Sequence, residues 1–252
     1  INARKLGLLV SSNNTQIRVL KKPKIAILAS GNELRKAGSI SNNGIISSNS
    51  SLLKSVISSF GGEPYDLGIA KDKSLSITKK LKDINKYNIL ITTGGASVGK
   101  HDLIKEVLEK LGMKLLFWKV AMRPGKPLIF GQLKNTIILG FPGNPVSTYV
   151  SALIFLKPLI NRYYKANTDH EIKYGILQKP LFKNDERQEY LRTQVHFKNN
   201  MYYLNPISNQ DSSMIYSLSK ADALLIREPH AKPLKKGNKV SFILFSDIHT
   251  AI

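Results

Sequence analysis

The fold is decided by the stretch Ile-Ala-Ile-Leu-Ala-Ser-Gly-Asn-Glu-Leu at residues 25–34, where an apolar run passes directly into a polar loop. The apolar residues 25–28 predict a core strand, because short apolar runs bounded by turn signals are typical of strands buried on both faces. A basic segment, residues 21–24, stands before this strand. Residues 1–22 are therefore expected to be a lead-in segment.

Strands and helices alternate after this first strand. Apolar residues recur at helical spacing from Leu52 to Phe60 and stop before Gly61 and Gly62, which can end a helix. The same alternation predicts strands at 65–69, 88–92, 115–120, 128–130 and 136–139 and helices at 75–84, 103–111 and 146–163. Such alternation implies parallel crossover units, and the expected fold class is an α/β three-layer domain with a mostly parallel sheet.

The pattern changes after residue 165, where helical periodicity gives way to short β-rich runs. These runs lie at 190–197, 201–204, 223–226 and 240–245. They predict a small β-barrel-like domain after the α/β domain. The expected division is a lead-in segment at 1–22, a ligand-binding α/β domain at 23–165 and a carboxy-terminal β domain at 170–247.

The composition favours a small anionic ligand. A net charge of +21 in 252 residues would favour nucleic acid or an anionic membrane, but the lysines are scattered and accompany no nucleic-acid-binding motif. No run of eighteen apolar residues and no signal peptide is present, so we expect a soluble protein without a membrane partner. The absence of cysteine agrees with a cytoplasmic location. Because the sequence begins at Ile1 without Met, we expect it to be part of a longer protein.

Three loops follow predicted strands, at 29–34, 92–99 and 140–145. Ligands of open α/β sheets bind beyond the carboxyl ends of the strands, where backbone N–H groups are available to anions. Gly94 and Gly95 lack a Cβ, so their backbone can approach a phosphate or a flat ring, although a tight turn would also explain them. The Pro-Gly-Asn-Pro turn at 142–145 is equally open to a structural interpretation.

A fourth element, residues 117–127, holds three cations within eight residues around a Pro-Gly turn. These cations are Lys119, Arg123 and Lys126, and their spacing favours an anion site. Asp102 follows the glycine loop and can either cap the next helix or hold a metal ion. Capping is the simpler of these two roles.

Together, segments 30–34, 92–102, 117–127 and 141–147 resemble the molybdopterin-binding domain of the molybdopterin molybdenumtransferase family, which includes the gephyrin E domain. The resemblance extends from about residue 5 to about residue 245. Shorter relatives that bind or adenylylate molybdopterin share the glycine loop but lack the β domain, which favours the transferase. The resemblance implies a carboxy-terminal half, preceded by two domains that complete a homodimer and its active sites.

The implied reaction inserts molybdate into adenylylated molybdopterin and gives the molybdenum cofactor and AMP, assisted by Mg²⁺. A molybdopterin adenylyltransferase is implied as the upstream partner. A cationic site suits this chemistry, because molybdate and the substrate phosphates are all anions.

The resemblance also implies roles for individual residues. Glu33 and Asp102 would handle the metal, and with Lys119 and Arg123 they form the implied catalytic set. The implied ligand-binding residues are Gly31, Asn32, Ser47, Gly94, Gly95, Ser97, Gly99, Lys126, Pro142, Gly143, Asn144, Pro145, Arg187, Arg192 and Ser212 or its neighbour Ser213.

Three positions depart from the family pattern. Asn32 stands where many members have Asp, and Ser47 stands where they have an acidic residue, so the site would bind Mg²⁺ less well. Arg123 stands where Lys is common, and its guanidinium presents a planar fork instead of a point charge.

Two other functions remain open from the sequence. The chain can be a binding module that holds molybdopterin or a protein partner without catalysis, as a gephyrin-like scaffold would. It can also be a basic nucleic-acid binder, which would show steeply salt-dependent affinity for any duplex.

Overall fold

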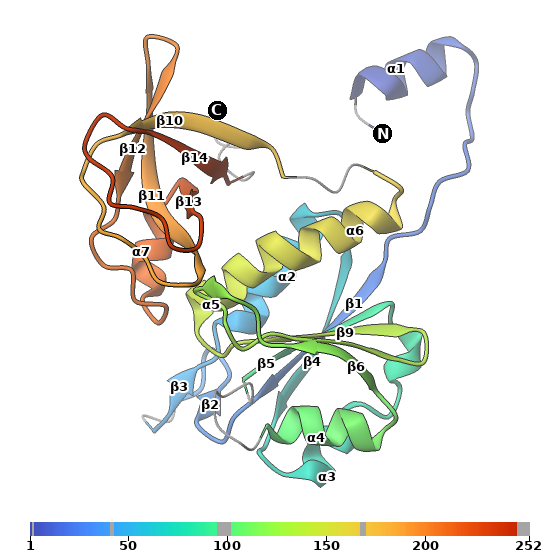
Figure 1. Ribbon diagram of the computed structural model, residues 1–252. Helices are drawn as coiled ribbons and strands as arrows, with labels where there is room; N and C mark the ends of the chain where they lie inside the picture. The colour runs from blue at the N-terminus through green and yellow to red at the C-terminus, as the bar shows by residue number, and fades with distance from the viewer. Residues whose placement is uncertain (2, 41–42, 95–101, 167–169, 246–252) are drawn as a thin grey trace.

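A computed structural model describes residues 1, 3–40, 43–94, 102–166 and 170–245, arranged as an α/β domain and a β domain (Figure 1). The helix α1 (Ala3–Ser11) precedes them on an extended arm and has no buried residue. In the described part of the chain, no helix is both long and apolar enough to cross a membrane.

The α/β domain is built on a six-stranded sheet with the order β4-β1-β5-β9-β8-β6. Its strands are β1 (Lys24–Ser30), β4 (Glu63–Ala70), β5 (Ile89–Thr93), β6 (Lys114–Trp118), β8 (Ile129–Leu133) and β9 (Thr136–Phe141). The strands β4, β1, β5 and β9 pair in parallel, whereas β8 is antiparallel to both of its neighbours. Only residues 134 and 135 connect β8 to β9, and so short a connection can form only an antiparallel hairpin. The expected mostly parallel sheet is confirmed.

Helices cover both faces of this sheet (Figure 1). One face carries α2 (Asn49–Ser59), α5 (Pro145–Ser151) and α6 (Lys157–Tyr163), and the other carries α3 (Ser74–Lys80) and α4 (Leu103–Lys110). Strand β1 shows the cause, because Ile25 and Ile27 join the core beneath α2 and α6, while Ala26 and Leu28 join the core beneath α3 and α4. A strand that is apolar on both faces requires two covering layers. The expected three-layer architecture is confirmed.

Several local features differ from the sequence prediction. The single helix expected at 146–163 contains a π-helical turn, Ala152–Leu156, between α5 and α6. The strand expected at 115–120 ends at Trp118, since Lys119 adopts a φ of +70°. A 3₁₀ turn, Ile84–Lys86, follows α3, and the two-residue strands β2 (Leu34–Arg35) and β3 (Ile45–Ile46) were not predicted because they are too short to show a period.

The β domain is a closed five-stranded barrel, as the sequence indicated. Its strands are β10 (Ile172–Leu177), β11 (Gln188–Lys198), β12 (Met201–Pro206), β13 (Ala223–Arg227) and β14 (Lys239–Leu244). They follow the order β12-β10-β14-β13-β11, and pairing of β11 with β12 closes the barrel around Leu177, Leu204, Leu225 and Phe242. The short helix α7 (Ile215–Ser219) packs near α5. The sequence prediction missed β10 and α7.

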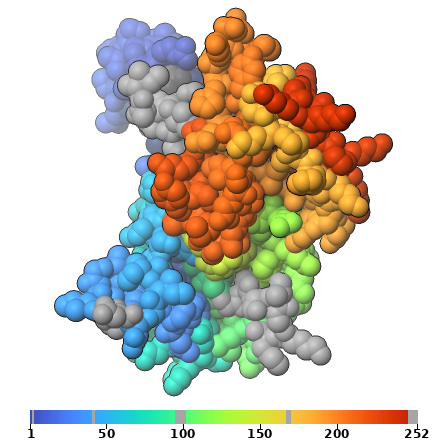
Figure 2. All heavy atoms as spheres, turned by 90° about the vertical axis from the view of Figure 1, so that its left-hand side faces the viewer, coloured from blue at the N-terminus to red at the C-terminus, as the bar shows by residue number. Residues whose placement is uncertain are grey.

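The two domains are joined by a short strand of the α/β domain that pairs with the barrel sheet. Strand β7 (Met122–Arg123) leaves the α/β domain and pairs in parallel with β11, opposite Gln188 and Glu189. Below this pairing, Met122, Val146 and Val150 share a core with Tyr190, Leu224 and Ile243 of the barrel. Figure 2 shows the barrel, in yellow to red, stacked directly on the α/β domain. The two domains therefore share one packed boundary.

We expect Leu53→Ala to lower the free energy of unfolding by about 2–5 kcal/mol, because Leu53, on the buried side of α2, is fully buried in the core and its truncation leaves a cavity. The matched control is Leu75→Ala, at a leucine that is 82% exposed, with an expected change within about 0.5 kcal/mol. Denaturant unfolding measures both. Equal effects of the two substitutions would contradict the packing described.

Candidate functional site

Loops from three neighbouring strands meet at the carboxyl edge of the sheet. A Cβ atom on Gly94, after β5, would lie only 2.1 Å from the carbonyl oxygen of Ser30, at the end of β1. A Cβ atom on Gly143, after β9, would lie 3.5 Å from the Cα of Gly94. Gly94 also has a φ of +82°, which L-residues rarely adopt. Glycine at position 94 is thus required for the loops to converge, while Gly95, Ser97 and Gly99 lie outside the described residues.

A carboxylate that the sequence prediction missed, that of Asp72, holds the first loop from outside it. The Asn32 and Asp72 residues bond reciprocally, because each side-chain oxygen accepts from the other's backbone N–H at 3.0–3.1 Å. The Ser30 hydroxyl donates to Asp72 at 2.9 Å. Asp72 follows β4, the neighbour of β1, and this position after a predicted strand is the signal that could have found it. The carboxylate of Asp72 therefore stands beside Asn32.

Glu33 and Asp102 have contrasting surroundings. Glu33 is exposed, and its carboxylate lies over Gly31, where a Cβ atom would come within 2.5 Å of Oε1. Asp102 is 4% exposed and caps α4 by accepting the Lys105 N–H at 2.9 Å, as its simpler predicted role requires. Burial raises the pKa of the Asp102 carboxyl, and its Oδ2 has no partner among the residues that the structure describes. A buried carboxylate oxygen without a partner favours a proton or a cation.

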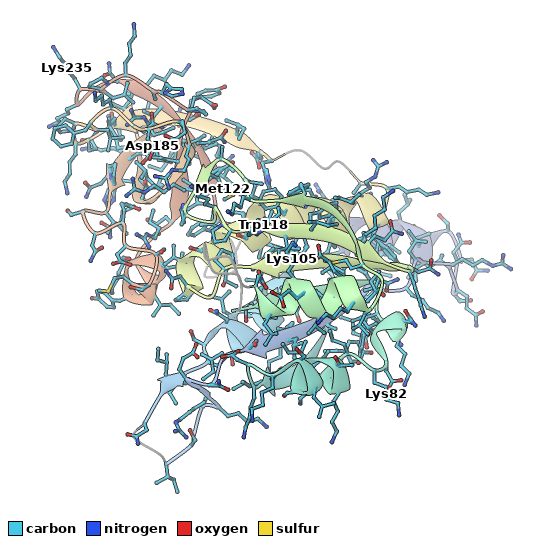
Figure 3. All side chains as sticks on the ribbon, turned by 60° about the horizontal axis from the view of Figure 1, so that its bottom comes forward. Lys82, Lys105, Trp118, Met122, Asp185 and Lys235 are labelled. Carbon is cyan, nitrogen blue, oxygen red and sulfur yellow. The ribbon has the colours of Figure 1, made fainter. Side chains whose placement is uncertain are left out.

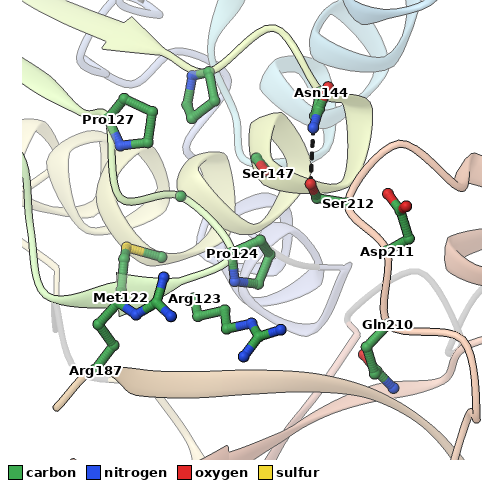
Figure 4. A pocket seen from close by; sticks show the side chains of 12 residues that line it. Met122, Arg123, Pro124, Pro127, Asn144, Ser147, Arg187, Gln210, Asp211 and Ser212 are labelled. Atoms are coloured by element: carbon green, nitrogen blue, oxygen red, sulfur yellow. Dashed lines mark hydrogen bonds between the residues drawn. The ribbon is translucent and has the colours of Figure 1, made fainter. Parts of the chain in front are cut away.

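A cavity of about 590 Å³ lies between the two domains (Figure 4). Five predicted site residues line it together, namely Arg123, Pro142, Asn144, Arg187 and Ser212. The two arginines lie on one side, and Gln210, Asp211 and Ser212 lie across from them. The remaining lining residues, which the prediction did not include, are Met122, Pro124, Gly125, Pro127, Ser147, Gln210 and Asp211.

The 142–145 turn ties the cavity wall to both domains. Asn144 Nδ2 donates to the Ser212 hydroxyl at 2.8 Å, and the backbone of Ser212 accepts from Val146 N at 3.2 Å. On its other side, the Gly143 carbonyl accepts from Asn49 Nδ2, on α2, at 2.6 Å. Pro145 occupies the first turn of α5. The structural interpretation of this turn therefore holds, and the turn also presents Asn144 to the cavity.

The two predicted barrel arginines have different roles. Arg192 is 1% exposed, and its guanidinium donates to the carbonyls of Asp211 at 2.8 Å and Asn209 at 3.1 Å. It therefore positions the turn that carries Gln210 and Ser212 without lining the cavity. Arg187 lines the cavity and forms an ion pair with Asp185, and the hydrogen bond from Arg187 lowers the pKa of that carboxyl to about 2.

Most of the other predicted residues do not line this cavity, and Lys119, Lys126 and Ser47 are among them. Lys119 is exposed, with its Nζ 4.0 Å from the centroid of the Trp118 ring, and Lys126 is exposed on the same loop. Figure 3 shows Trp118 and Lys105 on the α/β domain, farther from the barrel than Met122 is. Ser47 lines a separate cleft of about 230 Å³ with Asp66. Across the described ranges, no group of three or more His, Cys, Asp or Glu residues could hold a metal ion.

Comparison with protein-family models gives two matches. A model described as a probable molybdopterin binding domain matches residues 26–162, which is more than half of the chain. A second model, described as the MoeA C-terminal region (domain IV), matches residues 174–245.

Individual relatives agree with these matches. The chain is 31% identical to the molybdopterin molybdenumtransferase of Bacillus subtilis, with 96% of this chain and 57% of the relative covered. It is 30% identical to gephyrin of Dictyostelium discoideum, with 99% of this chain and 40% of the relative covered. Among solved structures, a molybdopterin biosynthesis MoeA protein from Pyrococcus horikoshii superposes with a TM-score of 0.84 at 26% identity, covering 98% of this chain and 60% of that one. The chain spans about half the length of the curated relatives it matches.

We expect Gly94→Ala to destabilise the protein by more than the roughly 1–2 kcal/mol that a left-handed L-residue costs, because the new methyl group would also meet the Ser30 carbonyl. Gly112→Ala is the matched control, since Gly112 has a φ of +95° but no atom within 4 Å of the point where a Cβ would lie. Thermal or denaturant unfolding separates the two contributions. Equal losses of unfolding free energy in the two variants would contradict the close approach of Gly94 to the Ser30 carbonyl.

Proposed function

The chain belongs to the molybdopterin-binding domain family, and from this we propose that it takes part in molybdenum cofactor biosynthesis by inserting molybdate into adenylylated molybdopterin, with release of AMP. The observation that carries the proposal is the interdomain cavity, whose lining combines Arg123 and Arg187 with the polar residues Asn144, Ser147 and Ser212 and one acid, Asp211. Guanidinium groups form charge-assisted hydrogen bonds with oxyanions, and hydroxyl and amide groups supply further donors. Molybdate, a small dianion, suits this lining.

The substrate's pterin phosphate is assigned to the carboxyl edge of the sheet. The glycine loop beginning at Gly94 would hold it, with the 142–145 turn forming the facing wall. Support comes from the convergence of these loops, which leaves Gly94 and Gly143 close together. Lys119 and Lys126 are exposed on the hairpin loop beside the cavity and would raise the local concentration of anions.

A divalent cation fits the carboxylates of this edge. Magnesium is commonly held by one or two carboxylates, while waters and substrate phosphates complete its coordination. Asp102 offers a buried oxygen that lacks a partner in the described part of the chain, and Glu33 offers an exposed carboxylate on the neighbouring loop. The ion would neutralise charge that develops as the phosphoanhydride bond breaks. Asp72 would offset the carboxylate missing at Asn32 by holding the loop through Ser30 and Asn32.

The oligomeric state, the location and the source of the substrate are part of the same proposal. We propose from the family resemblance a homodimer, in which amino-terminal domains complete each active site, and an adenylyltransferase that supplies the substrate. The cytoplasmic location is proposed from the composition. The alternative is a non-catalytic scaffold, and the similarity to gephyrin is the observation that supports it.

We expect the chain to bind molybdate and Arg187→Gln to weaken that binding by about tenfold, since a hydrogen bond to a charged group contributes on the order of 1.5–3 kcal/mol. Isothermal titration calorimetry with sodium molybdate measures the affinity. The matched control is Arg162→Gln, at an exposed arginine on α6 outside the cavity, which should leave the affinity unchanged. If Arg187→Gln bound molybdate with unchanged affinity, molybdate would not bind in this cavity and the assignment would be wrong.

We also expect AMP release from adenylylated molybdopterin to require both molybdate and Mg²⁺. The chain is assayed as it stands and extended through the amino-terminal domains that the resemblance implies. Faster release by the extended protein supports the enzyme and the role of those domains. Tight molybdopterin binding without any AMP release from the extended protein would instead support the scaffold.

A further inference from the structure

The barrel carries a second cleft of about 490 Å³, and Arg123 is the one residue of the α/β domain in its lining. It shares only Arg123 and Gln210 with the interdomain cavity. Its lining residues are Arg123, Lys179, Pro180, Leu181, Phe182, Lys183, Glu189, Leu191, Pro206, Ile207, Ser208, Gln210 and Arg227. Four of these are cations and one is an acid, so the lining has an excess positive charge.

The base of this barrel cleft contains a buried arginine. Arg227 is 3% exposed, and its Nη2 donates to the carbonyls of Phe182 at 3.1 Å, Ala231 at 3.3 Å and Lys232 at 2.9 Å. Its Nε is buried and has no hydrogen-bond partner among the described residues. Glu189 interacts electrostatically with Arg227, but its Oε1 also lies 3.6 Å from Arg123 Nη1. Glu189 is the one acid among the residues that line the cleft, and Asp185, outside the lining, also interacts electrostatically with Arg123. The lining with its four cations keeps a net positive charge, which favours an anion.

The same cleft has an apolar side that a simple anion would not use. Phe182 is 91% exposed, yet the Arg227 hydrogen bond to its carbonyl fixes the backbone that carries it. Pro180, Pro206 and Ile207 extend this apolar side. An exposed aromatic ring beside a group of cations is the combination that binds nucleotides, because the base stacks on the ring while cations hold the phosphate.

We propose that the barrel cleft is a separate binding site for a nucleoside monophosphate. The base packs against Phe182 and the prolines, and the phosphate lies among Lys179, Lys183 and Arg123, while the buried Arg227 holds the backbone that carries Phe182. The cleft offers one exposed ring and one group of cations, which matches a ligand with one ring system joined to one dianion. Its volume lies within the usual range of about 300–1,000 Å³ for small-molecule sites. This inference stands apart from the proposed function, because it needs neither molybdate nor turnover.

Calorimetric titration of the whole chain with AMP, adenosine and inorganic phosphate tests the site. We expect AMP to bind about tenfold or more tightly than either part alone, since stacking and charge contacts act together in one molecule. Equal affinities for AMP and inorganic phosphate would show that the base contributes nothing to binding and that the cleft binds anions without specificity, which would overturn the proposal. So would the absence of AMP binding.

Two pairs of variants locate the ligand. Phe182→Ala and Lys183→Gln, both at exposed side chains, are each expected to weaken AMP binding by about fivefold to tenfold. Their matched controls, expected to bind AMP as the parent does, are Tyr216→Ala, at a tyrosine 68% exposed on α7, and Lys235→Gln, on the outer part of the barrel (Figure 3). If Ser212→Ala weakens AMP binding while Phe182→Ala does not, the nucleotide occupies the interdomain cavity and the proposal fails. Molybdate-dependent turnover enters none of these measurements.

Discussion

The arrangement of the site depends on a single short pairing, that of β7 with β11. Two residues of the α/β domain, Met122 and Arg123, continue the barrel sheet beside Gln188 and Glu189. Met122 then enters a core made by both domains. One cavity wall comes from the 122–127 loop and the opposite wall comes from the barrel turn at 209–212, so the cavity depends on this pairing. The hydrogen bonds from Asn144 and Val146 to Ser212 hold the same boundary. A ligand in the cavity would contact both domains and strengthen the same boundary.

Sequence patterns predicted the parts of the fold that are locally determined. The apolar run at 25–28 and the helical spacing from Leu52 to Phe60 each depend on neighbours in sequence, and both elements formed where expected. Strand β7 has two residues and no period, so only its partner in space makes it a strand. The direction of β8 depended on a two-residue connection, which its apolar pattern does not reveal. Local patterns thus predicted the layers, while pairing between distant segments determined how the domains join.

The candidate site shows the same division. Arg123, Pro142, Asn144, Arg187 and Ser212 came from distant segments and meet at one cavity, which the order of motifs along the chain could suggest. Arg192 was predicted at the ligand but supports the 209–211 turn instead, because sequence cannot tell a buried arginine from an exposed one. Asp72 was missed because its link to Asn32 spans forty positions and becomes visible only when β4 lies beside β1. Residue type indicated the chemistry, and burial decided the role of each side chain.

The barrel uses buried arginine twice in a similar way. Arg192 holds the turn that lines the interdomain cavity, and Arg227 holds the loops that carry Phe182 and Lys232. Burying a cation is costly, and carbonyl hydrogen bonds offset part of that cost only where a planar guanidinium can reach several acceptors at once. Arg192 reaches its two carbonyls from separate nitrogens, Nη1 and Nη2, which the single nitrogen of lysine could not do, whereas Arg227 reaches three carbonyls from Nη2. Burial lowers the pKa of both arginines, because removal from water penalises the charged guanidinium. An anion bound in either cavity would therefore lower the cost of the charge that shapes it, so ligand binding and barrel stability are expected to be coupled.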